Sequence, residues 1–271
     1  MGHIKSLWIK GSKILVTRFD NAFLYVFMDY SSFKNLLLDQ MNKYVGIVLT
    51  EEQCNSFFVY MNLLIEKNKV MNLTAITEPE EIILRHFVDS SIPLKFYGDK
   101  FNSEKFICDI GTGAGFPGLP LAILCQDSSF VLNDTLGKRI NFLSEVIAEI
   151  KIKNVKLVKA RAEDFGHDKS YREKFDYVVS RGVSRISVLS EYSLPLVKLN
   201  GAMLSFKMDN CDEELSEGHN AIKKLGGMFH VKHTYSIVGG DPDRCILEIT
   251  KNEMTPKSYP RKAGTPASKP L

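Results

Sequence analysis

The sequence CDIGTGAGFPG, residues 108–118, joins a short apolar run to a loop that has a glycine at every second position. The apolar run belongs to the first of five strand-like segments, which lie at 106–110, 130–134, 155–160, 175–181 and 202–208. Segments with helical periodicity separate these strands, near 117–125, 138–150, 185–198 and 212–225. Such an alternation predicts an α/β fold with a doubly wound, mostly parallel sheet.

Two more strand-like segments, at 229–238 and 245–250, are joined by the turn sequence GGDPD. Because no helix lies between them, we expect these strands to pair antiparallel at an edge, in a sheet of seven strands. The first contains His230 and His233. Residues three apart on a strand point to opposite faces, and no cysteine or acid lies at ligand spacing, so we expect no metal site here.

The chain divides into four predicted parts, which are 1–27, 28–100, 101–251 and 252–271. Residues 28–100 have helical patterns and predict a helical cap, with capping-box signals at Thr50 with Gln53 and at Thr77 with Glu80. Residues 101–251 hold the sheet. The basic tail 252–271 is rich in proline, glycine and lysine and is expected to be extended and solvated. We expect residues 1–27 to be an upstream extension rather than an amphipathic anchor.

Composition places the protein among soluble globular proteins. It has 271 residues, 44% of them hydrophobic, and a formal net charge of only +3. The charge is uneven, because residues 251–271 carry five basic residues and one acidic residue. Affinity for nucleic acid must therefore come from local patches. The five cysteines are odd in number and never form a C-x-x-C pair, which predicts reduced thiols in a cytoplasm. No run approaches the ~18 apolar residues of a membrane span, so we expect no membrane attachment.

The glycine loop at the end of the first strand predicts a ligand site, since ligands bind at the carboxyl ends of strands in such sheets. Residues 113–118 formally satisfy the dinucleotide pattern G-x-G-x-x-G. However, we expect the Asp109 carboxylate to face the crevice, which is unfavourable for a pyrophosphate, and Pro117 removes a backbone donor. No Gly-Lys-Ser/Thr follows the loop, so a nucleotide triphosphate cradle is excluded.

The pattern D-x-G-x-G-x-G is typical of class I methyltransferases, which bind S-adenosylmethionine, a ligand without phosphate. It runs here from Asp109 through Gly111 and Gly113 to Gly115. Asp134, at the end of the second strand, is placed to accept hydrogen bonds from ribose hydroxyls. Ala162 and Glu163, after the third strand, are placed to frame the adenine. Acids after three successive strands favour the methyltransferase interpretation over a tight turn alone.

Seven stretches in order make the resemblance specific: NKVMNLTAI (68–76), RHFVDS (85–90), CDIGTGAGFPG (108–118), DTLGKRINFL (134–143), RAEDF (161–165), VVSRGVSRISVLSEYSLPLVK (178–198) and TPKSYPRKAGTP (255–266). The chain resembles the RsmG (GidB) family of bacterial 16S rRNA guanine-N(7) methyltransferases. The resemblance implies transfer of a methyl group from S-adenosylmethionine to a guanine in the 530 loop of 16S rRNA, the guanine at position 527. It also implies that the partner is 16S rRNA or the small ribosomal subunit.

The resemblance also assigns residues. It implies cofactor contacts at Gly111, Phe116, Ala162, Glu163 and Arg181. It implies a basic RNA-binding face of Lys138, Arg139, Arg161, Arg181, Arg261 and Lys262. The chain departs from the usual family pattern at Lys67, Thr135, Gly182 and Met208. Gly182 and Met208 are the departures that bear on the details of the pocket.

The chemistry needs no general base, because guanine N7 has a free lone pair. Positioning can supply most of the rate, and Arg181 is the candidate positioning residue. The segment FDYVVSRGV lacks the D/N-P-P-Y run of amino-group methylases and the Pro-Cys of pyrimidine methylases. His86 and Asp89 lie one helical turn apart, and we expect them to tie the cap to the sheet rather than to act as an acid–base pair.

Two other functions stay open at this point. A nicotinamide-dependent oxidoreductase would use the formal G-x-G-x-x-G motif. A non-catalytic RNA-binding protein on a methyltransferase fold would bind RNA without needing the cofactor. We expect a monomer, and the sequence leaves open whether free rRNA, an assembly intermediate or the finished subunit is the substrate.

Overall fold

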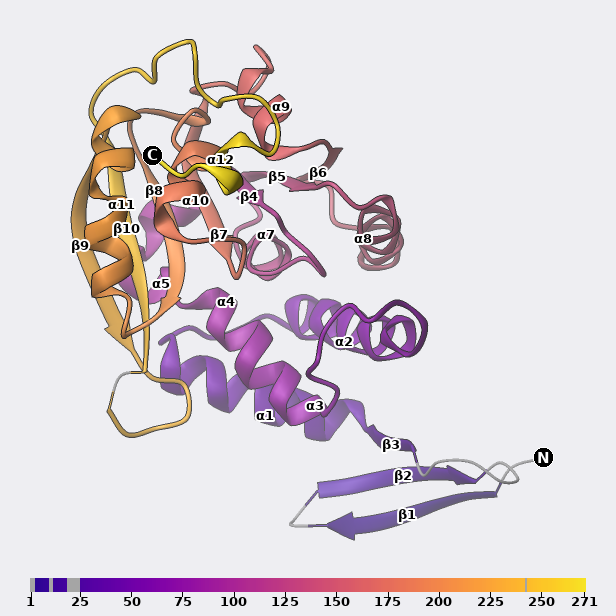
Figure 1. The fold of residues 1–271 in the computed structure, drawn as a ribbon. Coiled ribbons are helices and arrows are strands. Elements are labelled where there is room, and N and C mark those ends of the chain that lie inside the picture. The colour runs from indigo at the N-terminus through magenta and orange to yellow at the C-terminus, as the bar shows by residue number, and fades with distance from the viewer. Residues whose placement is uncertain (1–2, 10–11, 19–24, 242) are drawn as a thin grey trace.

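A seven-stranded sheet forms the centre of the computed structural model, which describes residues 3–9, 12–18, 25–241 and 243–271 (Figure 1). The strands are β4 (Phe106–Ile110), β5 (Ser129–Asp134), β6 (Val155–Lys159), β7 (Phe175–Arg181), β8 (Val197–Met208), β9 (Gly227–Tyr235) and β10 (Arg244–Lys251). Their order across the sheet is β6-β5-β4-β7-β8-β10-β9. Strands β4 to β8 pair in parallel, and β10 pairs antiparallel with both β8 and β9. The predicted class I methyltransferase fold is confirmed, including the antiparallel edge.

The order in which successive strands are added to the sheet reverses between the neighbouring strands β4 and β7. It runs outward from β4 through β5 to β6 and returns to pair β7 with the other side of β4. The loops that follow β4 and β7 diverge at this point and leave a crevice at the carboxyl ends of the strands. The glycine loop after β4 therefore lies where a ligand site is expected.

Helices cover both faces of the sheet and form two separate cores. The helices that connect the strands are α7 (Gly118–Leu124), α8 (Gly137–Ile150), α9 (Ala162–His167), α10 (Ile186–Ser193) and α11 (Asp212–Lys224). Side chains of α7 and α8 pack in one core together with the cap, and those of α9, α10 and α11 pack in the other. The predicted helix near 185–198 ends early, at Ser193, because Pro195 cannot continue it. Helix α9 was not predicted, since its six residues are too few to show periodicity.

The cap consists of α1 (Tyr30–Tyr44), α2 (Glu51–Met71), α3 (Pro79–Ile82), the π-helical turn η1 (Ile83–Val88), α4 (Asp89–Ser91), α5 (Pro93–Tyr97) and α6 (Asp99–Asn102). The capping box of Thr50 with Gln53 is confirmed, with bonds of 2.9 and 3.2 Å. The one predicted for Thr77 with Glu80 is wrong. Helix α3 begins at Pro79, whose ring fixes a helical φ and needs no N–H partner, so no side chain caps it.

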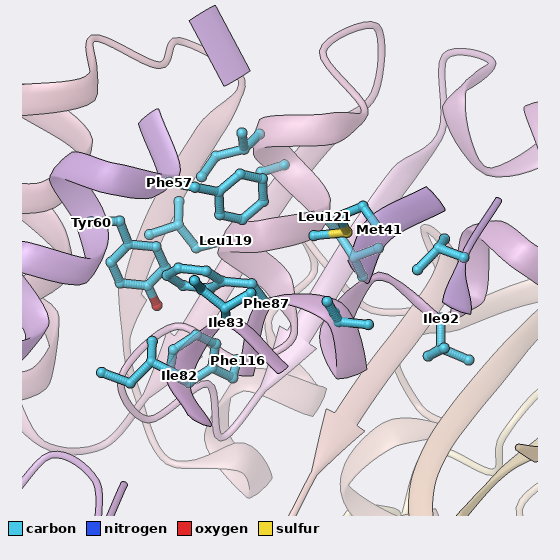
Figure 2. Close-up of a cluster of buried hydrophobic side chains, with 14 of the residues drawn as sticks. Met41, Phe57, Tyr60, Ile82, Ile83, Phe87, Ile92, Phe116, Leu119 and Leu121 are labelled. Carbon is cyan, nitrogen blue, oxygen red and sulfur yellow. The ribbon is translucent and has the colours of Figure 1, made fainter. Parts of the chain in front are cut away.

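The apolar faces of the cap helices pack against the glycine loop and α7 (Figure 2). Phe57 and Phe87 lie 4.8 Å apart between ring centroids, and Tyr60 stacks on Phe116 at 5.5 Å. The Tyr60 hydroxyl donates to the carbonyl of Ala114, inside the glycine loop. The cap thus packs against the glycine loop and limits the movement of that loop.

The tail 252–271 is ordered against the sheet domain, so the prediction of a solvated tail is wrong. Pro260 and Pro266 are buried, and the tail ends in the short helix α12 (Thr265–Ser268). The guanidinium of Arg172 donates to four carbonyls, those of Gly166, Tyr259, Thr255 and Pro256. Side chains of the domain therefore satisfy the tail's backbone, which composition alone does not reveal.

The strands β1 (His3–Ile9), β2 (Ser12–Arg18) and β3 (Tyr25–Met28) form a three-stranded sheet in the order β1-β2-β3. The prediction that 1–27 is an extension falls partly on residues 1–2, 10–11 and 19–24, which lie outside the described residues, and it stays a prediction. All five cysteines are buried and free of disulfides, as predicted. Among the described helices none is long and apolar enough to cross a membrane.

Candidate active site

A cavity of about 850 Å³ lies at the carboxyl ends of β4, β5, β6 and β7. Its walls include Gly111 after β4, Asp134 at the end of β5, Ala162 and Glu163 after β6, and Gly182 after β7. Four of the predicted cofactor residues, Gly111, Asp134, Ala162 and Glu163, are therefore brought together in one cavity. The predicted crevice is confirmed as a hollow at this end of the sheet.

The glycine loop needs glycine for both its conformation and its close packing. Gly111, Gly113 and Gly115 have φ angles of +70°, +62° and +110°, a region that other residues rarely adopt. A β-carbon on Gly111 would lie 2.6 Å from the Val183 side chain, which packs beside it and also lines the cavity. The bare backbone of Gly111 thereby reaches the cavity surface.

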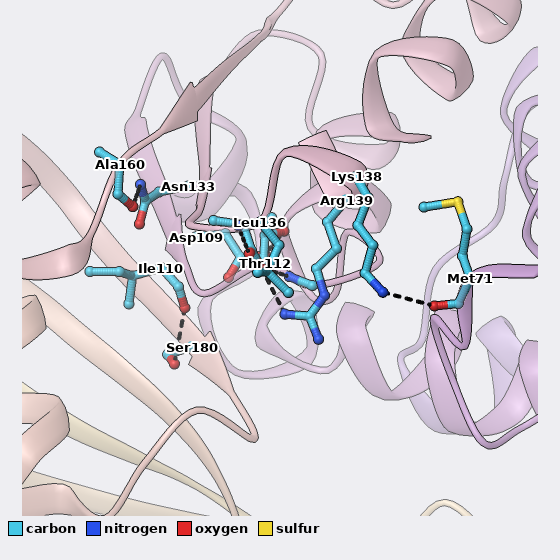
Figure 3. A network of polar contacts seen from close by, with 12 residues as sticks. Met71, Asp109, Ile110, Thr112, Asn133, Leu136, Lys138, Arg139, Ala160 and Ser180 are labelled. Atoms are coloured by element: carbon cyan, nitrogen blue, oxygen red, sulfur yellow. Dashed lines mark hydrogen bonds and ion pairs between the residues drawn. The ribbon is translucent and has the colours of Figure 1, made fainter. Parts of the chain in front are cut away.

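Asp109 supports the loop from inside the protein. It is fully buried, and its Oδ2 atom accepts hydrogen bonds from Thr112 Oγ1 at 2.7 Å and from the Gly118 N–H at 2.8 Å (Figure 3). Burial raises the pKa of this carboxyl to about 7, because few groups compensate its loss of water. The prediction that Asp109 faces the crevice is wrong. Its two bonds join the loop to the start of α7.

Asp134 is the carboxylate that does face the cavity. Its Oδ1 atom accepts from the Leu136 N–H at 2.8 Å, and Oδ2 accepts from the Gly113 N–H at 3.0 Å and from Arg139 Nη1 at 3.1 Å. Gly113 therefore acts by positioning Asp134. A carboxylate has about four lone-pair sites, and these three hydrogen bonds use three of them. Asp134 can thus accept further hydrogen bonds from a ligand in the cavity.

Glu163 connects the cavity to the tail. The residue is 8% exposed and lines the cavity, and its Oε1 atom accepts a hydrogen bond from the Gly264 N–H at 2.8 Å. Gly264 itself lies in the cavity wall. The place of Gly264 in the cavity wall was missed, because Gly264 and Glu163 are 101 positions apart and no local sequence signal links them.

Three cationic side chains line the same cavity: Arg139, Lys159 and Arg161. Lys159 was not among the predicted residues. Lys138 turns the other way, and its ammonium lies 3.4 Å from the carbonyl of Met71 at the end of α2 (Figure 3). The three cations exceed the two carboxylates of the cavity, Asp134 and Glu163, so its mouth suits an anionic partner.

The two predicted RNA-binding residues of the tail differ in their surroundings. Arg261 is engaged by the fully buried Glu191, which accepts from its backbone N–H, Nε and Nη2 at distances of 2.6–3.1 Å. Lys262, the next residue, is exposed. Of the two predicted RNA-binding residues in the tail, only Lys262 presents its charge freely to solvent.

Arg181 and Phe116 lie at the interface with the cap rather than in the wall of the large cavity. Arg181 Nη1 donates to Asp89 Oδ2 at 2.5 Å, and its guanidinium lies 5.1 Å above the Phe116 ring. The His86 ring stacks on the Phe116 ring, with the two ring centroids 4.3 Å apart. Burial, with the nearby Arg181 charge, lowers the pKa of His86 to about 3. The prediction that His86 and Asp89 tie the cap to the sheet is confirmed.

The sequence profile of the family described as rRNA small subunit methyltransferase G matches residues 53–238. The chain belongs to this family. A ribosomal RNA small subunit methyltransferase G from Lactobacillus johnsonii is 46% identical over 232 residues, which cover 86% of this chain and 97% of that protein. The protein of the same description from Desulforamulus reducens is 46% identical over 236 residues, covering 87% and 98% of the two chains.

More distant likeness exists to solved structures. A 16S rRNA (adenine(1408)-N(1))-methyltransferase from Catenulisporales acidiphilia superposes with a TM-score of 0.48 and 13% identity, over 60% of this chain and 93% of that chain. A sarcosine dimethylglycine methyltransferase from Galdieria sulphuraria gives 0.49 and 13%, over 65% and 89%.

Proposed function

We propose that the protein transfers a methyl group from S-adenosylmethionine to N7 of a guanine in the 530 loop of 16S rRNA. The membership of the rRNA small subunit methyltransferase G family supports an rRNA methyltransferase. The observation that carries the proposal to the site is the cavity where Asp134 and Glu163 face the backbone of Gly111. The choice of N7 and of the loop rests on the sequence resemblance.

The residues present fit this cofactor. The volume of about 850 Å³ is within the range of small-molecule sites, roughly 300–1,000 Å³. Asp134 would accept hydrogen bonds from the ribose hydroxyls of the cofactor. Ala162 and Glu163 would border its adenine, and the Gly111 backbone would border its methionine part. When bound, S-adenosylmethionine supplies a methyl group on a positively charged sulfur.

The chain's own residues contribute position and desolvation rather than proton transfer. Guanine N7 carries no proton, so no base is required. His86, with its lowered pKa, is neutral near pH 7 and packs in the cap interface, where it positions Arg181. Holding the two reactants in line and excluding water supplies the rate enhancement.

The substrate RNA would be held by cations at the mouth of the cavity. Arg139, Lys159 and Arg161 line it, and Lys262 is exposed on the tail that borders it. These side chains would bind phosphates and set the register of the RNA, while the target base leaves its stack and enters the protein. In this scheme the cap 28–100 supports the catalytic part 101–251, and the tail 252–271 completes its rim.

The test is methylation of small-subunit RNA and subunits from a strain that lacks the modification, with methyl-labelled S-adenosylmethionine, followed by nucleoside analysis. Label in 7-methylguanosine that, at limiting S-adenosylmethionine, falls about 10-fold or more in Asp134→Asn supports the proposal. Label in another nucleoside contradicts the proposed target. If neither free RNA nor subunits acquire label while RNA still binds in a salt-dependent manner, the protein is an RNA-binding protein instead.

A further inference from the structure

A second cavity, of about 270 Å³, lies on the other side of Gly182 from the cofactor cavity. Gly182 lines both cavities, so the two spaces are neighbours across a residue without a side chain. The wall of the second cavity comes from distant parts of the chain: Asp89 in the cap, Arg181 at the end of β7, Phe206 and Met208 in β8, Tyr235 in β9 and Arg244 in β10. A base held there would lie next to the methyl donor.

The two arginines of this cavity differ in how their donors are used. Arg181 donates to Asp89, to the Arg85 carbonyl at 3.2 Å and to His86 Nδ1 at 3.3 Å, so its fork is largely committed to the cap. Arg244 contacts Asp89 Oδ1 at 3.3 Å through Nη1. Its Nε is buried and lies 3.9 Å from Asp243 Oδ2, beyond hydrogen-bond distance, so Nε–H makes no hydrogen bond within the described part of the chain. Arg244 is thus the guanidinium with unused donor capacity.

The rest of the wall suits a flat ring. Phe206 and Met208 are apolar, and the Met208 side chain is 53% exposed although it lies opposite Arg244 in the β8–β10 pair. The ammonium of Lys207 is taken up by Glu214 at 2.5 Å and by the Ser184 carbonyl at 2.7 Å. An apolar surface beside an unsatisfied guanidinium is a site for an aromatic ring that carries a hydrogen-bond acceptor.

We infer that the second cavity receives the target base and that Arg244 recognises it by donating to O6 of guanine. The inference rests on the proposed function and names the residue that selects the substrate at the same site. O6 and N7 are adjacent acceptors on one edge of guanine, so a guanidinium at O6 can orient N7 toward the Gly182 side without occupying it. Adenine presents an amino group at that position, and two donors would then face each other.

Asp89 is the positioning residue for this contact. It is 1% exposed, and its Oδ1 atom also accepts the Tyr235 hydroxyl at 2.8 Å. Tyr235 and Arg181 keep the carboxylate paired when Arg244 is replaced, so an Arg244 variant does not leave a bare buried charge. Arg244→Met retains the length and apolar stem of the side chain and removes its donors.

The experiment compares wild type, Arg244→Met and Arg244→Lys on small subunits reconstituted with ligated 16S RNA. The target position carries guanine, inosine, which keeps O6, or 2-aminopurine, which lacks it. Arg244→Met is expected to slow transfer to guanine and inosine roughly 5- to 150-fold and to change transfer to 2-aminopurine little, since a base contact of this kind contributes about 1–3 kcal/mol. Arg244→Lys should recover part of the preference for O6.

Calorimetric binding of S-adenosylmethionine and the melting temperature report whether the variants are folded. An equal loss on all three bases, or no loss, would overturn the role of Arg244 while leaving the proposed function intact. Wild type that fails to methylate guanine but binds the cofactor would instead refute the proposed function itself, and the base contact with it.

Discussion

Arg181 and Asp89 form a buried ion pair, with Nη1 and Oδ2 2.5 Å apart across 92 positions of sequence. Asp89 lies in the cap and Arg181 at the end of β7, at the carboxyl edge of the sheet. Asp89 also binds Tyr235 in β9 and Arg244 in β10. One carboxylate of the cap is therefore joined to three strands of the sheet.

Arg181→Ala is expected to lower the free energy of unfolding by about 2 kcal/mol, because it removes a charge-assisted hydrogen bond to the buried Asp89, which keeps Tyr235 and Arg244 as partners. Urea denaturation measures the change. Arg185→Ala is the matched control: its ion pair with Glu217 is 60% and 53% exposed, and its loss should cost less than about 1 kcal/mol. Similar losses in the two variants would show that the Arg181 pair is no stronger than a surface pair.

Asp109 and Asp134 are expected to differ in cofactor binding. Asp134→Asn should lower the affinity for S-adenosylmethionine at least about 10-fold, because a charge-assisted hydrogen bond in the cavity contributes about 1.5–3 kcal/mol. Asp109→Asn should change the affinity about threefold or less, since an amide oxygen can still accept from Thr112 and Gly118. Isothermal titration calorimetry on both variants tests this, and the reverse order of effects would restore Asp109 as a cofactor ligand.

Arg261 and Lys262 are adjacent, but substitution of Arg261 should change the stability of the fold and substitution of Lys262 should change RNA binding. Arg261→Ala leaves the buried Glu191 without its partner and should destabilise the fold by about 3 kcal/mol. Lys262→Ala should leave the melting temperature unchanged and lower the slope of RNA affinity against salt by about one unit. If Lys262→Ala leaves that slope unchanged, Lys262 does not bind a phosphate.

His86 makes the fold sensitive to acid. Its pKa is about 3 in the folded protein and near 6.5 in the unfolded chain, so between these values the unfolded chain binds more protons. The contribution of His86 to the free energy of unfolding is fully present above pH 6.5 and decreases as the pH falls toward 3. Between pH 7 and 5 the loss should be about 2 kcal/mol, and His86→Gln should lack it. Denaturation curves of both proteins at the two pH values decide the matter; parallel losses would exclude His86.

Sequence patterns were sufficient for the strands and for several residues at their ends. The bounds of β4 and β7 match the predicted segments, because polar or glycine residues border both apolar runs. Asp134 and Glu163 line the cavity because parallel strands end at one edge of the sheet. The direction of a side chain is a different matter. Asp109 turns inward because Thr112 and the Gly118 N–H offer it donors, which no periodicity reveals.

Contacts between distant segments account for the other differences. The tail is held by Arg172 and Glu191, and Gly264 reaches Glu163 across 101 positions. Arg244 comes into the site only because β10 lies between β8 and β9. Each of these contacts depends on how distant segments pack together, and residue spacing along the chain carries no information about that packing.

The cations in the wall of the cofactor cavity have a kinetic consequence. Arg139, Lys159 and Arg161 line that cavity, while the cap side is fastened by the Asp89 ion pair. RNA bound across these cations would cover the route by which the small molecule enters and leaves. Steady-state turnover should then follow a compulsory order, with S-adenosylmethionine first on and the demethylated product last off. That product should inhibit competitively against S-adenosylmethionine and noncompetitively against RNA, whereas a random order would show that the RNA leaves the passage open.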